Sequence, residues 1–134
     1  MFHVEPRMGQ KMLGGLIETK AWGTSQILFH DLGAELVRIK PLKGGYSSEH
    51  MHRHKHNLFV VQSGCLVINL WDENGHDIKT LWPGDTIMVE AGVWHQFQAV
   101  EDTVAHELYL KSDKSPGVFH DDIVRRSQGG IRSS

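Results

Sequence analysis

The sequence has almost no cysteine, no long apolar run and no excess of either charge sign. The single cysteine, Cys65, excludes an internal disulfide framework and favours a reducing, cytoplasmic location. No apolar run approaches the roughly 20 residues that a membrane-spanning helix needs, and no secretory signal pattern opens the chain. The net charge of −2 gives no reason to expect nucleic acid or an anionic membrane as a partner. We therefore expect a cytoplasmic protein that binds neither.

The remaining composition is that of one ordinary globular domain. The chain has 134 residues, of which 40% are hydrophobic and 22% charged. Apolar and polar residues alternate in short segments separated by turn signals, such as Asn74-Gly75 and Pro83-Gly84. The predicted strands are 25–30, 34–40, 58–62, 65–71, 76–82, 86–89, 94–100 and 103–110. This pattern predicts an all-β fold, an antiparallel barrel or double-sheet jelly roll.

A histidine-rich stretch lies between Gly44 and Gly64. Four of the ten histidines fall here, at positions 50, 52, 54 and 56. Alternate residues of a strand point to one face, so these rings could converge on a metal ion, for which neutral imidazole is a common ligand. The alternative is a solvated histidine-rich loop without a metal.

A second stretch, 84–99, carries His95 behind a turn centred on a glycine. Together the two stretches resemble the two motifs of the cupin superfamily, whose fold is an antiparallel double-stranded β-helix. The positions that match the motifs are Gly44, His50, His52, Gly64, Gly84, Gly92 and His95. The motif glutamate is replaced by Asn57, its proline by Glu90 and its asparagine by Ala99.

The cupin resemblance implies one divalent metal ion held inside the barrel. Carried over by position, its ligands are His50, His52 and His95, with Asn57 at the fourth place. A neutral amide stabilises a dication less than a carboxylate does, so His56 and His54 are alternative fourth ligands. Three histidines with open positions suit Zn, Ni, Mn or Fe(II), and the residues do not choose among these metals.

A closer resemblance is to the type II mannose-6-phosphate isomerase cupin domain. The matching positions are Trp22, Gly23, Ser48, His52, Val61, Gly64, Gly92, His95 and the segment 121–125, Asp-Asp-Ile-Val-Arg. At three positions of that family's first motif this chain differs, with His50 for its Gln, Lys55 for its Arg and Asn57 for its Glu. The resemblance implies isomerisation of a sugar or sugar phosphate.

Roles for other side chains follow from this resemblance and from their chemistry. Glu107 is the first candidate for the base that moves a proton, and His54 is the second. The candidates for binding a phosphate are Arg125, Lys55 and Arg38. Trp94 is a candidate for stacking on a sugar ring, although packing is its more ordinary role. For Asp121 and Asp122 we expect capping or ion pairing.

Two other functions stay open at this stage. One is an Fe(II) dioxygenase or lyase acting on a small molecule, and the other is a non-catalytic cupin that binds a sugar. We expect 1–20 to form an N-terminal arm or edge strand, 21–111 the barrel and 112–134 a C-terminal tail. Short edge strands and the arm also predict a homodimer.

Overall fold

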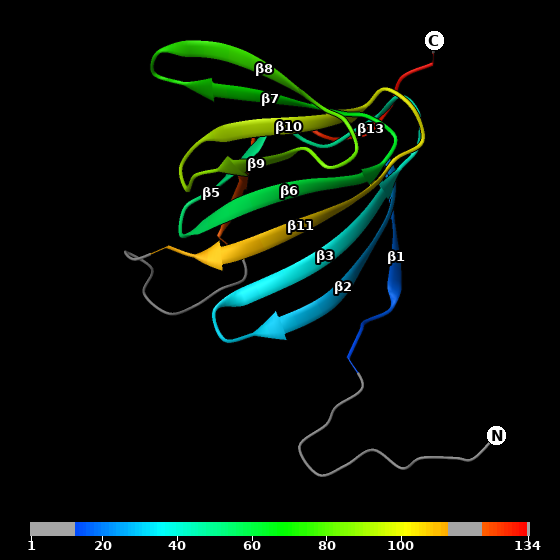
Figure 1. Cartoon of the computed structure of the whole chain (residues 1–134). Helices are drawn as coiled ribbons and strands as arrows, with labels where there is room; N and C mark the ends of the chain where they lie inside the picture. The colour runs from blue at the N-terminus through cyan, green and yellow to red at the C-terminus, as the bar shows by residue number, and fades with distance from the viewer. Residues whose placement is uncertain (1–12, 113–121, 134) are drawn as a thin grey trace, which may run out of the picture.

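The computed structural model describes residues 13–112 and 122–133, and within these ranges the protein is built from thirteen β-strands. Asp121, for which capping or ion pairing is expected, lies outside the described residues. No helix in the described ranges is long and apolar enough to cross a membrane. Two antiparallel sheets face each other, with β7, β8 and β10 above β6, β11 and β3 in the view of Figure 1.

The first sheet has six strands in the order β1-β2-β3-β11-β6-β9. These strands are β1 (Ile17–Lys20), β2 (Gly23–Asp31), β3 (Ala34–Pro41), β11 (Val104–Lys111), β6 (Lys55–Ser63) and β9 (Thr86–Val89). Strands β3, β11 and β6 occupy its middle. Their side chains alternate between a buried and a more exposed face, as one buried sheet face requires.

The second sheet has seven strands. Its order is β12-β5-β10-β4-β13, and β7 pairs with both β10 and β8. The strands are β12 (Ile123–Arg125), β5 (His50–His52), β10 (Trp94–Ala99), β4 (Gly45–Tyr46), β13 (Gly130–Ile131), β7 (Leu66–Asp72) and β8 (Gly75–Leu81). Strand β12, near the C-terminus, therefore lies beside β5, which carries the first two histidines of the histidine-rich stretch.

The hydrophobic core fills the space between the inner faces of the sheets. Its buried members include Val37, Ile39, Phe59, Val61, Leu66, Ile68, Phe97 and Ala105. On β6 and β11 the inward positions turn polar toward one end of the strand, where Lys55, Asn57 and Glu107 are buried instead. The core thus closes one part of the barrel and leaves a polar interior in the other.

Two of the motif glycines are required by close backbone approaches. Gly64 ends β6 with a φ of 88°, and an added Cβ would lie 2.5 Å from the carbonyl oxygen of Asp102. Gly44 has a φ of 82°, and its Cβ would meet the backbone of Arg132. A side chain at either position would strain the backbone and collide with it.

The predicted all-β jelly roll is confirmed, and each of the eight predicted strands overlaps an observed one. The five remaining strands, β1, β4, β5, β12 and β13, are two to four residues long. Apart from β5, whose two histidines share the buried face, such short segments show no alternation of their own. They become strands because a distant segment pairs with their backbone, as β12 does with β5.

Candidate metal centre

Three buried histidines meet between β5 and β10. His95 is the direct cross-strand partner of His50, and His52 lies two residues further along β5, on the same face. One ring nitrogen from each lies within 4.8 Å of the other two. The ring centroids of His50 and His95 are 4.3 Å apart. Segments far apart in the chain thus deliver three imidazoles to one point.

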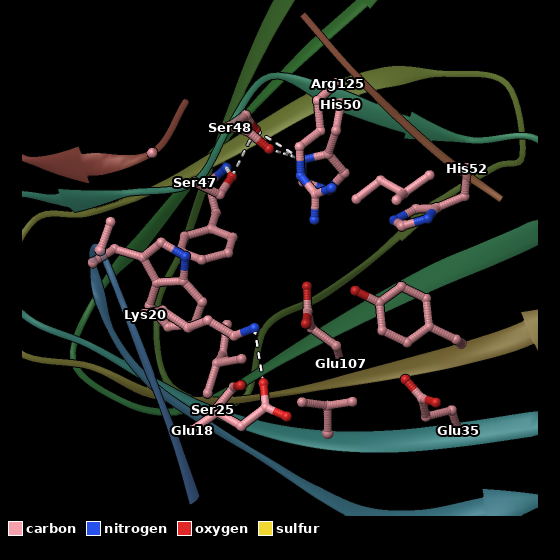
Figure 2. A pocket seen from close by; sticks show the side chains of 18 of the residues that line it. Glu18, Lys20, Ser25, Glu35, Ser47, Ser48, His50, His52, Glu107 and Arg125 are labelled. Atoms are coloured by element: carbon pink, nitrogen blue, oxygen red, sulfur yellow. Dashed lines mark hydrogen bonds and ion pairs between the residues drawn. The ribbon is translucent and has the colours of Figure 1, made fainter. Parts of the chain in front are cut away.

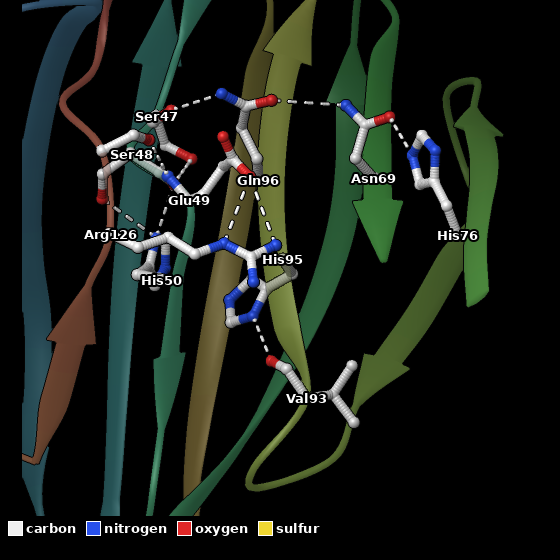
Figure 3. Close-up of polar contacts among 11 residues, drawn as sticks. Ser47, Ser48, Glu49, His50, Asn69, His76, Val93, His95, Gln96 and Arg126 are labelled. Atoms are coloured by element: carbon white, nitrogen blue, oxygen red, sulfur yellow. Dashed lines mark hydrogen bonds and ion pairs between the residues drawn. The ribbon is translucent and has the colours of Figure 1, made fainter. Parts of the chain in front are cut away.

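Backbone carbonyls orient two of these rings (Figure 3). The Nδ1 atom of His50 lies 2.8 Å from the carbonyl oxygen of Ser48, and that of His95 lies 2.9 Å from the carbonyl oxygen of Val93. A carbonyl oxygen only accepts, so Nδ1 carries the proton in both rings and Nε2 presents a lone pair. This backbone support of the outer nitrogen is typical of histidines that bind metals.

Burial keeps all three rings neutral. Loss of hydration lowers the pKa of His50 to about 4, that of His52 to about 2 and that of His95 to about 3. The Nε2 atoms of His52 and His95 are buried without a hydrogen-bond partner among the described residues. Neutral imidazoles with orphaned, converging nitrogens are the donor set that Zn, Ni, Mn or Fe(II) accepts, so these residues fit a divalent metal ion.

The alternation of inward and outward side chains changes phase within the histidine-rich stretch. A bend at Arg53 and His54 separates β5 from β6 and shifts the phase by one residue. Lys55 and Asn57, rather than His54 and His56, are therefore buried on the inner face of β6. The Nδ1 atom of His56 accepts the Ala91 N–H at 3.0 Å. The convergence expected from a two-residue period is wrong for His54 and His56.

Asn57, at the fourth motif position, is buried with an amide oxygen that lacks a partner among the described residues. Its side chain is fully buried, and its Nδ2 donates to Glu107 at 3.4 Å. Its Oδ1 has no hydrogen-bond partner among the described residues. A buried amide oxygen without a partner is costly unless something else satisfies it. Asn57 is thus a better candidate for a fourth ligand than His56.

A cavity of about 480 Å³ adjoins the histidines and extends toward β1. Its lining includes His50, His52, Glu107, Arg125 and the Glu18–Lys20 ion pair, which measures 3.0 Å. Figure 2 shows the Glu107 carboxylate and the Arg125 side chain pointing into the space from opposite sides. A molecule in this cavity would touch both the metal centre and charged side chains of either sign.

Glu107 combines burial with a position beside the histidines. Desolvation raises its pKa to about 7, although hydrogen bonds from Asn57 and Tyr109 oppose that shift. Tyr109 is also buried, and its ring lies 5.1 Å from that of His52. A carboxyl group that titrates near neutral pH can both take and return a proton.

Two cationic side chains border the cavity. Lys55 is buried, with Nζ 3.7 Å from an Asp122 carboxylate oxygen and 4.3 Å from the Tyr109 ring centroid. Arg125 is more exposed and lines the cavity near His50. Lys55 is therefore part of a buried polar network, whereas Arg125 offers its guanidinium to a ligand at the surface.

Three candidate residues do not line the cavity. Arg38 alternates with the inward residues Val37 and Ile39, and its Nε lies 3.3 Å from His106 on the outer face. Trp94 likewise points outward from β10, where Arg126 stacks on it at 4.4 Å. His54 lies at the bend. We leave these three out of the proposed substrate site.

Two contributors were not assigned to the site from the sequence. Tyr109 shares the inner face of β11 with Glu107, and alternation along that strand was a signal that could have identified it. Asp122 was expected only to cap or to form ion pairs, and it does pair with Lys55. Its approach to His52, at 3.5 Å between Oδ1 and Nδ1, depends on the pairing of β12 with β5 and has no sequence signal.

Comparison with known proteins agrees with this geometry. The sequence profile of the cupin domain family matches residues 37–110. An oxalate decarboxylase from Arthroderma benhamiae is 32% identical over 73 residues, which are 54% of this chain and 17% of that protein. The chain therefore spans about a sixth of the length of this relative.

Solved structures share the fold at low identity. KdgF from Halomonas sp. is 21% identical, with a TM-score of 0.60 over 68% of this chain and 80% of that one. A mutant of Bacillus subtilis oxalate decarboxylase OxdC is 15% identical, with a TM-score of 0.70 over 84% and 32%. The structure from a study of the Mn(II) centres of the same decarboxylase is 15% identical, with a TM-score of 0.64 over 79% of this chain and 31% of that one.

Proposed function

This chain belongs to the cupin domain family, and we propose that it is a metal-dependent enzyme that isomerises a sugar or sugar phosphate. The observation that carries the proposal is the placement of Glu107, with a pKa near 7, in a cavity that is also lined by His50 and His52, two of the three converging neutral histidines. An isomerase needs such a pair, a centre that polarises oxygen atoms and a base that moves a proton between neighbouring carbons.

His50, His52 and His95, with Asn57 as the fourth candidate, would hold the metal. When bound, the metal supplies a Lewis acid that polarises the carbonyl and hydroxyl oxygens of the substrate. Glu107, ionised, takes the proton from the carbon beside the carbonyl and returns it to the adjacent carbon. Asn57 and Tyr109 hydrogen-bond to the Glu107 side chain and hold it in place.

The cationic groups favour an anionic substrate. Arg125 presents up to five N–H donors at the cavity lining, a suitable partner for a phosphate or carboxylate. Lys55 also lines the cavity, where its ammonium group pairs with the buried Asp122 carboxylate. The volume of about 480 Å³ lies within the range of small-molecule sites and accommodates a sugar phosphate.

The test is solvent exchange. Protein loaded with Zn, Ni, Mn or Fe(II) is incubated in deuterium oxide with a panel of aldoses, ketoses and their phosphates, and ¹H NMR follows the protons beside the carbonyl. We expect metal-dependent deuterium incorporation that falls by about 10²–10⁴-fold in Glu107→Gln. The exposed Glu101→Gln variant is the control and keeps full exchange. Absence of exchange with every metal and substrate would refute the isomerase.

A lyase or decarboxylase is the second candidate. The similarity to an oxalate decarboxylase, 32% over 73 residues, is the observation that favours it. The same metal-loaded samples, given small dicarboxylates, would then release carbon dioxide, or consume oxygen if the reaction is a dioxygenation. Tight binding of a sugar without any turnover would instead support the non-catalytic alternative.

We also propose that the protein is a cytoplasmic homodimer. Strand β1 forms one edge of the first sheet; Leu16, just before it, is 90% exposed, and Ile17, its first residue, is 67% exposed. An apolar edge strand is a surface that a second copy can cover. Light scattering after size exclusion should give the dimer mass, and Ile17→Lys should give the monomer. A monomeric wild-type protein would refute this part.

A further inference from the structure

Asp122 lies at the point where β12 reaches the three histidines. Strand β12 runs antiparallel to β5, with Ile123 opposite His52 and Arg125 opposite His50. Asp122 immediately precedes β12, and its side chain is only 4% exposed. A buried carboxylate has to be satisfied by charges or hydrogen-bond donors around it.

One part of Asp122 holds the bend between β5 and β6. Its Oδ2 accepts the His54 N–H at 2.8 Å, and its backbone carbonyl accepts the Arg53 N–H at 3.3 Å. The two amides that the bend removes from strand pairing are thus satisfied by a single residue. The bend in turn directs His52 inward on one side and Lys55 inward on the other.

The other carboxylate oxygen faces His52. Oδ1 lies 3.5 Å from the Nδ1 atom of His52 and 3.7 Å from the Nζ atom of Lys55. Both Oδ1 and Nδ1 are buried, and neither makes a hydrogen bond among the described residues. Because a carboxylate oxygen only accepts, its proximity favours the tautomer of His52 that carries its proton on Nδ1. The Nε2 lone pair of His52 is then free.

We propose that Asp122 is a positioning residue of the metal centre: it selects the Nδ1–H tautomer of His52 and orients that ring through the bend. In His50 and His95 a backbone carbonyl accepts from Nδ1 and orients the ring. Among the described residues no carbonyl contacts the Nδ1 atom of His52. The inference rests on the proposed role of His52 as a ligand, but the tautomer is a property of the metal-free protein.

The Asp122→Asn variant isolates this role. The His54 N–H is the closest donor to the carboxylate, so the amide oxygen of the variant stays on it and the bend is kept. The amide nitrogen, a donor, then faces the Nδ1 atom of His52 and favours the opposite tautomer, with the proton on Nε2. That proton blocks the atom that would bind the metal.

The experiment measures ring ¹⁵N shifts of His52 in metal-free protein and the affinity for Zn and Mn by calorimetry. We expect Nδ1–H in the wild type, Nε2–H in Asp122→Asn, and a loss of affinity of about 10–100-fold in that variant. The control is Arg126→Gln, which breaks the contact of the same C-terminal segment with Glu49, 3.3 Å away, without touching His52. It should keep both the tautomer and the affinity.

Three results would overturn the proposal. The first is an Nε2–H tautomer of His52 in the wild type. This measurement does not depend on whether any variant folds. The second is an Asp122→Asn variant with unchanged tautomer and affinity. The third is an equal loss of metal affinity in Asp122→Asn and Arg126→Gln with the tautomer of His52 unchanged. The C-terminal segment would then support the site only by packing over it. One further outcome separates the two proposals. If the His52 tautomer reverses in Asp122→Asn but the wild-type protein binds no metal, the positioning of His52 is supported and the proposed function is refuted.

Discussion

His50 and His95 are direct cross-strand partners on β5 and β10, and their ring centroids are 4.3 Å apart. A single register of the second sheet therefore places two of the three imidazoles together. The ring of His52, on the same face of β5, completes the cluster. Strand β5 contributes two of the three imidazoles and β10 contributes only His95, so loss of His95 leaves ligands on a single strand.

Replacement of His95 by Ala should remove stoichiometric metal binding, since two imidazoles on one strand remain. Elemental analysis of protein purified without an affinity tag measures this directly. His106→Ala is the matched control, because His106 contacts Arg38 rather than the cluster. Equal metal content in His95→Ala and wild type would show that the cluster is not the metal site.

Asn57→Ala should weaken metal binding by about tenfold, the lower end of the effect seen for groups that support a metal site. The reason is the orphaned Oδ1 atom of Asn57, which the variant removes. Competition with a chelator measures the affinity. If His56→Ala lowers the affinity and Asn57→Ala does not, the fourth ligand is His56 after all.

Glu107 should make stability fall as the pH rises. Its pKa is raised from 4.5 to about 7 by burial, so the folded state favours the protonated acid. That preference stabilises the fold fully below pH 4.5 and is lost as the pH rises through about 7. The shift corresponds to about 3 kcal/mol.

The measurement is urea unfolding of metal-free wild type and Glu107→Gln across this pH range. The free energy of unfolding of the wild type, minus that of the variant, should fall by about 3 kcal/mol between pH 4.5 and pH 8. The three histidines titrate in both proteins and cancel in the difference. A difference that does not change with pH would mean that Glu107 ionises as an ordinary glutamate.

Substitutions of Arg125 and Lys55 should have different effects, the first on substrate binding and the second on stability. Arg125→Gln should raise KM for an anionic substrate about tenfold or more, with little change in the free energy of unfolding, because the residue is exposed. Lys55→Met should instead cost about 3 kcal/mol of stability, since it leaves the buried Asp122 carboxylate without its ammonium partner. Steady-state kinetics and urea unfolding give the two quantities, and a reversed assignment would contradict the placement of both residues.

The sequence by itself determined the fold class and most of the metal cluster. Alternation along β3, β6 and β11 depends on neighbouring residues alone, so each strand with a buried face could be recognised from its own segment. The spacing of His50, His52 and His95 relative to the motif glycines likewise identified the three side chains that the structure brings within 4.8 Å. Local pattern was sufficient for the strands, and the resemblance to the cupin motifs was sufficient for the three histidines.

Tertiary structure alone decided which neighbours surround that cluster. The bend at Arg53 and His54 reverses the expected phase, and it exists because Asp122, far along the chain, accepts the backbone N–H groups of both residues. The same long-range pairing brings Arg125 to the cavity, while alternation on β3 turns Arg38 away from it. Hydrogen bonds between distant strands have no counterpart in local sequence spacing, so only the folded chain shows them.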